Sequence, residues 1–321
     1  MSDLSKQSSA SKLAHFPITF FAMIMGMSGL TLVWEKASLV FAAPPIIGHI
    51  LLTLTACLFL ILVMIYLLKI ILKTEAVSEE FQHPIKLSFF PAFSISMILL
   101  SIATLSISRE LSFTLWSIGT LLHLMLTIYV LNQWIHHPKF QIIHMTPAWF
   151  IPVVGNILVP IAGVEHGYTE VSWFFFSIGI IYWVVLKTLV LNRMMFHDPM
   201  PGKLLPTMFI LIAPPAVGFI SYLKLNGELD NFARILFYAA MFLLVLLLSQ
   251  LPRFTRIKFF MSWWAYSFPI AASAIAAQLM FTLNGAPFFY YLAFALTGLS
   301  SIVIPLLLLR TLLAVMRNEI C

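Results

Sequence analysis

The sequence predicts an all-α membrane protein with ten transmembrane helices, paired as five helical hairpins, in which an inner ring of kinked helices encloses a central pore and an outer ring of straight helices surrounds it. Hydrophobic residues make up 61% of the 321 residues and charged residues only 9%, and the mean hydropathy is +1.00. These values lie far from those of a soluble domain. Apolar runs long enough to cross a bilayer recur along the chain, and prolines fall almost entirely in every second run.

The apolar runs are separated by short connections that leave no room for a soluble domain. Each run approaches the roughly 20 residues that a spanning helix requires. We therefore expect one transmembrane domain over residues 16–313, a flexible cytoplasmic tail over 1–15 and a short cytoplasmic tail over 314–321. The expected helices cover residues 17–34, 45–68, 87–108, 111–135, 146–164, 171–192, 204–223, 232–251, 259–283 and 288–309.

Basic residues predict the orientation of the chain. Thirteen of the 18 Lys and Arg residues fall on the side where the first helix begins, four fall on the opposite side, and Lys187 lies within the sixth expected helix. The positive-inside rule then places both termini in the cytoplasm. Lipid headgroups are the expected partners of these scattered charges. No nucleic-acid site is expected, because the basic residues do not cluster on one face. Cys57 and Cys321 suggest neither a metal site nor a disulfide, so no cofactor or metal is expected.

Prolines distinguish the odd-numbered expected helices from the even-numbered ones. A proline removes one backbone hydrogen bond and kinks a helix, and at membrane depth the freed carbonyl must find another partner. A hairpin repeated five times, with kinked helices inside, explains the alternation; the alternative is that the kinks only shape packing. The prolines of the odd helices are Pro17, Pro91, Pro147, Pro152, Pro160, Pro206, Pro214, Pro215 and Pro269, whereas Pro305 alone lies inside an even helix.

The depth of each odd helix in the bilayer can be counted from its first residue. At 1.5 Å per residue, the centre of a ~30 Å core lies roughly ten residues along each helix. The residues at that depth are Gly26, Ser96, Asn156, Pro214 and Phe268. Four of them are small, amidic or helix-breaking and leave space or expose backbone. Phe268 is the one large ring among them, which predicts a plug in a narrow lumen.

No acidic or basic side chain lies inside any odd helix. Hydroxyls, an amide and backbone dipoles bind ions weakly, which favours a passive channel over a proton-coupled carrier with an ionisable relay. His123 and Lys187 lie on even helices. His123 is either a relay or a hydrogen-bonded interface residue, and Lys187 is expected to extend its amine to the cytoplasmic surface.

Five stretches of the sequence resemble the TehA family, the bacterial relatives of the plant guard-cell slow anion channels. The likeness extends from Phe16 to about Leu309, and the connection Asn226-Gly227-Glu228-Leu229-Asp230 is its most specific part. The stretches are FPITFFAMIMGMSGLTLVW, HPIKLSFFPAF, TPAWFIPVVGN, IAPPAVGFISYLKLNGELDNFARIL and WAYSFPIA.

The resemblance implies a homotrimer in the bacterial inner membrane, with one pore per subunit that passes small anions. In that family a phenylalanine blocks the pore within a Trp-Ala-aromatic-Ser-Phe sequence, and residues 264–268 match it. Two departures are visible: Lys187 stands where relatives carry an acid, and Pro269 stands where they have glycine. The Pro269 kink is expected to point the Phe268 ring across the lumen. The alternative is that Phe268 is one of 29 phenylalanines that pack between helices.

Two functions are compatible with these features. The first is a gated anion channel for chloride or nitrate. The second is a secondary transporter that exports an organic acid or an oxyanion, such as malate, sulfite or a tellurite-related ion. An enzyme is not expected, because no nucleophile, base or metal set can be assigned to one cavity.

Overall fold

The structure, a computed structural model, describes residues 12–317 and 319 and contains only helices and connections in this part of the chain. Nine helices in the described part are long and apolar enough to cross a membrane. The protein is therefore an all-α membrane protein, as the composition predicts. Most of the expected N-terminal tail, residues 1–11, lies outside the described residues, as do residues 318, 320 and 321.

The fifth expected span, residues 146–164, forms a shorter apolar helix, Pro147–Gly163, that alternates between 3₁₀ and α geometry. It consists of four short pieces: the 3₁₀ turn η4 (Pro147–Trp149), the α-helix α7 (Phe150–Val154), the 3₁₀ turn η5 (Gly155–Leu158) and the α-helix α8 (Val159–Gly163). Proline lacks the amide hydrogen that a continuous helix requires, and three prolines fall within these 17 residues. The tenth span therefore stays a prediction, while nine have the expected form.

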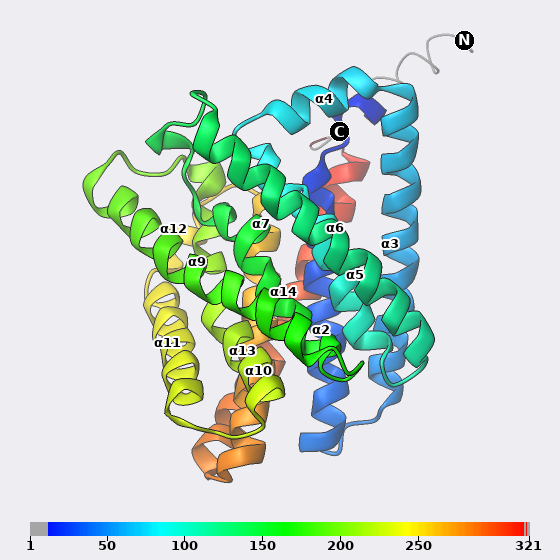
Figure 1. The fold of residues 1–321 in the computed structure, drawn as a ribbon, viewed down its shortest axis with the longest axis vertical. Helices are drawn as coiled ribbons and strands as arrows, with labels where there is room; N and C mark the ends of the chain where they lie inside the picture. The colour runs from blue at the N-terminus through cyan, green and yellow to red at the C-terminus, as the bar shows by residue number, and fades with distance from the viewer. Residues whose placement is uncertain (1–11, 318, 320–321) are drawn as a thin grey trace.

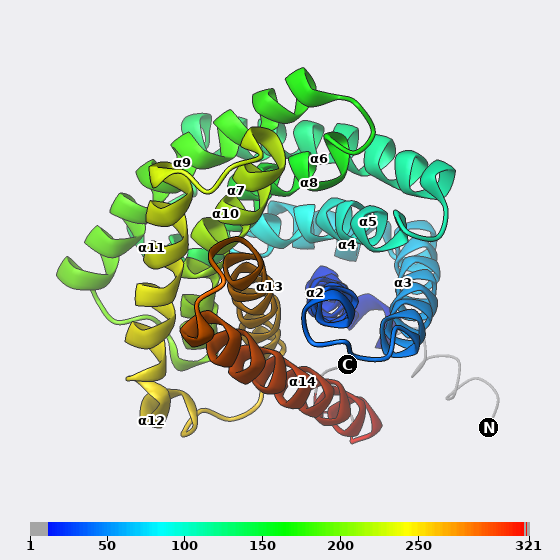
Figure 2. The ribbon, with the colours of Figure 1, turned by 90° about the horizontal axis from the view of Figure 1, so that it is seen from below.

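The helices form two concentric layers, which are clearest when the bundle is viewed along its long axis (Figure 2). The outer layer consists of long helices. The inner layer contains the first, third, fifth, seventh and ninth expected spans. Both described ends of the chain lie at one end of the bundle, which we call the terminal end (Figure 1). The outer helices are α3 (Ile46–Leu72), α6 (Arg109–His136), α9 (Thr169–Phe196), α11 (Asn231–Leu248) and α14 (Pro287–Met316). The inner segments are η1–α2 (Ile18–Phe20, Phe21–Val40), η2–α5 (Lys86–Phe89, Pro91–Thr104), the broken segment η4–α8, η6–α10 (Gly202–Leu211, Ala213–Asn226) and η7–α13 (Met261–Tyr266, Ser267–Asn284).

Three short helices lie in the connections at the terminal end: α4 (Thr74–Gln82), η3 (Ile142–His144) and α12 (Leu251–Phe254). The last residue of α14, Met316, extends three positions beyond the expected end of the transmembrane domain at residue 313.

Each inner segment begins with 3₁₀ geometry and then becomes α-helical, and this corrects the expected origin of the kinks. Pro91 is the first residue of α5, Pro214 and Pro215 are the second and third of α10, and Pro269 is the third of α13. The first turn of an α-helix has amides without intrahelical acceptors, so proline costs little there. The prolines mark the junction between 3₁₀ and α geometry instead of interrupting a continuous α-helix. Pro17 precedes η1 in an extended conformation, and Pro152 lies third in α7.

Side chains from neighbouring helices satisfy the carbonyls at these junctions. The Oγ1 of Thr127 in α6 donates to the carbonyl of Pro152 at 2.6 Å. The indole of Trp116, also in α6, donates to Val159 O at 3.0 Å. A buried carbonyl without a partner would cost about 1–3 kcal/mol. The straight outer helix α6 therefore stabilises the most irregular inner segment.

A buried ion pair fixes the start of the first inner segment. Lys69 of α3 and Glu80 of α4 are 2.7 Å apart, and only 2% and 3% of their side chains are exposed. Lys69 Nζ also donates to Phe16 O, and Ile18 N donates to Glu80 Oε1, both at 2.8 Å. Every charge in the pair thus has backbone partners, as a buried pair requires.

Candidate pore cavity

A cavity of about 330 Å³ opens at the terminal end and is lined by all five inner segments. We call it the vestibule and define its floor by the last residue that each segment contributes to it. Because the inner segments all run in the same direction from the terminal end, these residues mark the closed end of the cavity. The floor residues are Met25, Ile95, Leu158, Val217 and Pro269.

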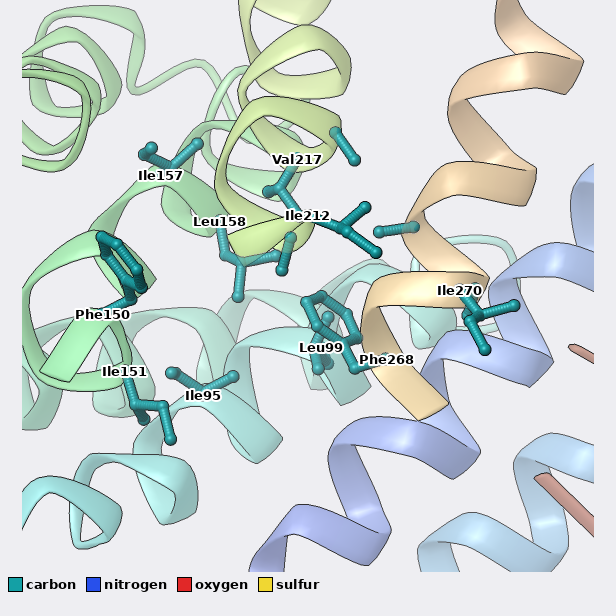
Figure 3. Close-up of a cluster of buried hydrophobic side chains, with 14 of the residues drawn as sticks. Ile95, Leu99, Phe150, Ile151, Ile157, Leu158, Ile212, Val217, Phe268 and Ile270 are labelled. Atoms are coloured by element: carbon teal, nitrogen blue, oxygen red, sulfur yellow. The ribbon is translucent and has the colours of Figure 1, made fainter. Parts of the chain in front are cut away.

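Phe268 lies at this floor, directly before Pro269. Its side chain is 8% exposed and points from the start of α13 toward the cluster that contains Ile95, Leu158 and Val217 (Figure 3). The 3₁₀ stretch η7 ends at Tyr266, and Ser267 Oγ donates to Trp264 O at 2.6 Å. The change from 3₁₀ to α geometry therefore sets the direction of the Phe268 side chain, and Pro269 occupies the first turn that follows.

Gly29 of α2 packs against α13 beside Phe268. A Cβ placed on Gly29 would lie 3.4 Å from Cδ2 of Phe268 and 2.9 Å from Cβ of Ala271. A side chain at this position would clash with Ala271 and would only touch the Phe268 ring. Nothing in the sequence distinguishes Gly29 from the other glycines. The depth count therefore selected Gly26 on the same helix instead.

Three of the residues from the depth count face neighbouring helices and do not line the vestibule. A Cβ on Gly26 would lie 2.3 Å from Ser267 Oγ, so this glycine allows α2 to pack against the start of α13. Ser96 Oγ donates to Ala92 O at 2.7 Å and to Phe21 O at 3.3 Å. Asn156 Nδ2 donates to Thr127 Oγ1 at 3.1 Å. A depth count gives height along a helix but not the direction of a side chain.

The prolines divide in the same way. Pro214 and Pro269 line the vestibule, whereas Pro17, Pro91, Pro152 and Pro215 shape the inner segments without lining it. A 3₁₀ stretch rises about 2.0 Å per residue instead of 1.5 Å. The uniform rise assumed in the count was therefore wrong for these segments.

The mouth of the vestibule is basic. Lys86 and Lys203 line it together with His83, and the lining includes no acidic residue in the described part of the chain. Partial burial lowers the pKa of His83, and the neighbouring charges of Lys86, His144 and Lys203 lower it further. His83 Nδ1 also accepts the amide of Ile85 at 3.1 Å, which favours the neutral ring. The sequence indicated this basic mouth by placing a basic residue close to the start of several inner segments.

His123 and Lys187 lie outside the vestibule lining. His123 is fully buried, and its Nδ1 lies 2.9 Å from Ser94 Oγ. A Cβ on Gly155 would lie 2.8 Å from its Nε2, so the ring packs against the broken inner segment. Lys187 Nζ lies 4.9 Å above the ring of Trp183 on the same outer helix. The position of His123 agrees with an interface role, and the reach of the Lys187 amine to the cytoplasmic surface stays a prediction.

The sequence matches the family model described as voltage-dependent anion channel, SLAC1, over residues 15–312. It is 30% identical to the S-type anion channel SLAH3 of Arabidopsis thaliana over 310 residues, which cover 94% of this chain and 48% of that protein. It is 32% identical to the S-type anion channel SLAH2 of the same plant, over 82% of this chain and 52% of that protein. The chain thus spans about half the length of these plant relatives.

A bacterial relative matches over nearly its whole length. The tellurite resistance protein TehA homolog of Haemophilus influenzae is 23% identical, with 94% of this chain and 92% of that protein covered. The family model covers most of the chain, and the resemblance noted from the sequence motifs is confirmed. The protein belongs to the SLAC1 family of voltage-dependent anion channels.

Proposed function

We propose that this protein is a gated channel that conducts small inorganic anions such as chloride and nitrate passively, with the Phe268 ring as its gate. The observation that carries the proposal is the vestibule: one cavity, lined by all five inner segments, that ends at Phe268. Membership in an anion channel family supports passive anion transport as the function.

The charge of the vestibule supports anions as the permeant species. Lys86 and Lys203 stand at the mouth, and the described lining carries no acid. Fixed positive charge at a narrow mouth raises the local concentration of anions. The deeper lining is apolar, so an anion is attracted to the mouth without being held by a charge at the floor. Weak binding of this kind allows fast release.

Two observations support Phe268 as the gate. The ring lies at the floor of the cavity, and residues 264–268 match the sequence in which the resembling family places its pore-blocking phenylalanine. Rotation of one side chain then changes access through the floor without moving a helix.

The assembly and orientation complete the proposal. We place the terminal end in the cytoplasm because the sequence assigns thirteen of the 18 basic residues to the side where the first helix begins. The resemblance implies a homotrimer in a bacterial inner membrane, with one pore in each subunit. The outer helices present apolar side chains such as Phe242, which is 65% exposed in the single chain, to lipid or to a neighbouring subunit.

The experiment is a recording from purified protein in liposomes under voltage clamp. With unequal salt on the two sides, the reversal potential is expected to follow the anion gradient, and exchange of chloride for nitrate is expected to preserve current. A reversal potential that follows the cation gradient would contradict the proposal. Particle mass in detergent tests the trimer separately, because a stable monomer would remove that part alone.

The second candidate function is a secondary transporter for an organic acid or an oxyanion. Two observations favour it: the vestibule is closed at its floor, as in one state of a carrier, and one relative is named an uncharacterized transporter, MJ0762 of Methanocaldococcus jannaschii, 24% identical over 97% of this chain. Flux of malate or sulfite that requires a proton gradient would favour the carrier. Anion current without any proton gradient would favour the channel.

A further inference from the structure

Arg193 is a buried cation. It lies near the end of outer helix α9 and is 2% exposed, and its Nε and Nη1 have no hydrogen-bond partner among the described residues. Lys69, equally buried, has both Glu80 and Phe16 O as partners. A guanidinium stays charged at any physiological pH. Because burying an unpaired charge costs several kcal/mol, an anion from outside the described part of the chain would stabilise Arg193.

Arg193 lines a surface pocket of about 620 Å³ that lies outside the vestibule. Its walls come from the connection after α6, residues 141–143, from the end of α9 at Phe196, and from the connection after α9, residues 197–199. Three apolar side chains of these walls are open to the surroundings: Ile142 is 50% exposed, Ile143 53% and Phe196 73%. The pocket therefore combines a buried cation with an exposed apolar rim.

The other charged wall residue, Asp198, does not neutralise the arginine. It is exposed, and no ion pair joins it to Arg193 in the described part of the chain. His197 and Gln141 are the remaining polar wall residues. A phosphate group has several charged oxygens and can accept two N–H bonds from one guanidinium. An apolar rim next to such a group suits hydrocarbon.

We propose that Arg193 binds the phosphate group of an anionic phospholipid from the surrounding membrane. The phosphate oxygens accept from the guanidinium of Arg193 where it lines the pocket, and the acyl chains follow Ile142, Ile143 and Phe196. The position supports a membrane lipid, because the pocket lies at the end of a spanning helix, where headgroups are found. The site joins the connections that lead into η4 and η6, so the lipid braces two inner segments from outside.

The test is thermal unfolding of delipidated protein in detergent, with three additions measured in parallel: phosphatidylglycerol, phosphatidylcholine and inorganic phosphate. A ligand that binds only the folded state raises the midpoint. We expect phosphatidylglycerol to raise the wild-type midpoint by several °C, on the order of 2–4 °C for each 1 kcal/mol of stabilisation. Phosphatidylcholine is expected to have little effect. Arg193→Gln should lose the response, and the control Arg253→Gln, an exposed arginine at the same end, should keep it.

The outcomes separate the sources of the anion. If inorganic phosphate stabilises the wild type as strongly as the lipid does, and Arg193→Gln loses that response, the site takes a soluble phosphate and the lipid source is wrong. If Arg193→Gln keeps the full response to phosphatidylglycerol, the proposal is overturned. A loss of particle mass in Arg193→Gln would instead show that a neighbouring subunit covers the arginine.

A second variant protects the test against misfolding. Arg193→Lys keeps the charge but offers fewer donors in a fixed geometry. Its response to phosphatidylglycerol should be smaller than that of the wild type. An unchanged response in Arg193→Lys, with Arg193→Gln unfolded, would also contradict the proposal.

Discussion

The inner and outer layers solve the problem of a membrane environment in opposite ways. In the outer helices α3, α6, α9, α11 and α14, between 28% and 33% of the most apolar window is buried, whereas the four long inner segments bury between 67% and 83%. The outer helices satisfy their own backbone and can face lipid. The inner segments break their backbone and depend on neighbours for partners. Irregular backbone is thus confined to the layer that encloses the cavity.

The largest difference is expected between a buried and an exposed ion pair. Glu80→Ala leaves Lys69 charged and buried at the start of the first inner segment, which should cost about 3–5 kcal/mol of unfolding free energy. Glu165→Ala at the opposite end breaks a pair whose side chains are 43% and 46% exposed, and solvent screening should limit its cost to about 0–1 kcal/mol. Denaturant titration of both variants measures the contrast. Equal losses would show that burial does not decide the strength of these pairs.

Two phenylalanines test the two layers with the same substitution. Phe219 of inner helix α10 is fully buried, and Phe219→Ala should cost about 3–5 kcal/mol because it leaves a cavity. Phe242 of outer helix α11 is 65% exposed, and Phe242→Ala should change stability by about 0.5 kcal/mol or less. Thermal unfolding in detergent compares the variants. The layer assignment fails if Phe242→Ala is the more damaging substitution.

Glycines in the two layers should respond with opposite signs. Gly29→Ala places a Cβ 2.9 Å from Ala271 Cβ, so overpacking should cost about 1–3 kcal/mol. Gly298→Ala on outer helix α14 meets nothing within 4 Å and should stabilise the helix by about 0.5–1 kcal/mol. The midpoints of unfolding give both signs. A destabilised Gly298→Ala would indicate that a neighbouring subunit packs at that position.

The smallest expected effect is the pH dependence of the vestibule mouth. The pKa of His83 is lowered by partial burial and by Lys86, His144 and Lys203, below its ordinary value of 6.5. Between the lowered pKa and 6.5, the unfolded chain binds a proton that the folded chain does not, so stability rises with pH in this window and is lost as pH falls. His83→Gln should flatten that slope. A slope that is unchanged in His83→Gln would exclude His83 as its source.

The layered fold could be read from the sequence because it depends on composition and on proline position. Apolar runs predicted the transmembrane spans. Prolines such as Pro91, Pro214 and Pro269 predicted which spans belong to the inner layer. The cause assigned to the kinks was wrong in detail, since these prolines start α segments after 3₁₀ turns. A 3₁₀ stretch, with three residues per turn, is too short to leave a recognisable periodic pattern in the sequence.

The site was only partly readable. Phe268 and Pro214 line the vestibule, whereas Gly26, Ser96 and Asn156 make contacts between helices, and the roles of these residues in a pore stay predictions. Depth along a helix depends on residue number alone, whereas side-chain direction depends on how neighbouring helices rotate. Arg193 was counted only as one more basic residue, because its burial arises from contacts distant in sequence.

The measurement that tests the central claim most directly is anion conductance of Phe268→Ala in liposomes, with Phe242→Ala as the control. If the Phe268 ring closes the floor of the vestibule, its removal should raise conductance on the order of tenfold or more, since a tenfold change corresponds to about 1.4 kcal/mol of barrier. The loss of stability should remain below that of Phe219→Ala, because a ring at a cavity floor has fewer packing partners. A Phe268→Ala protein that conducts no better than the wild type, and is destabilised as much as Phe219→Ala, would show that the ring is a packing residue and that the gate lies elsewhere.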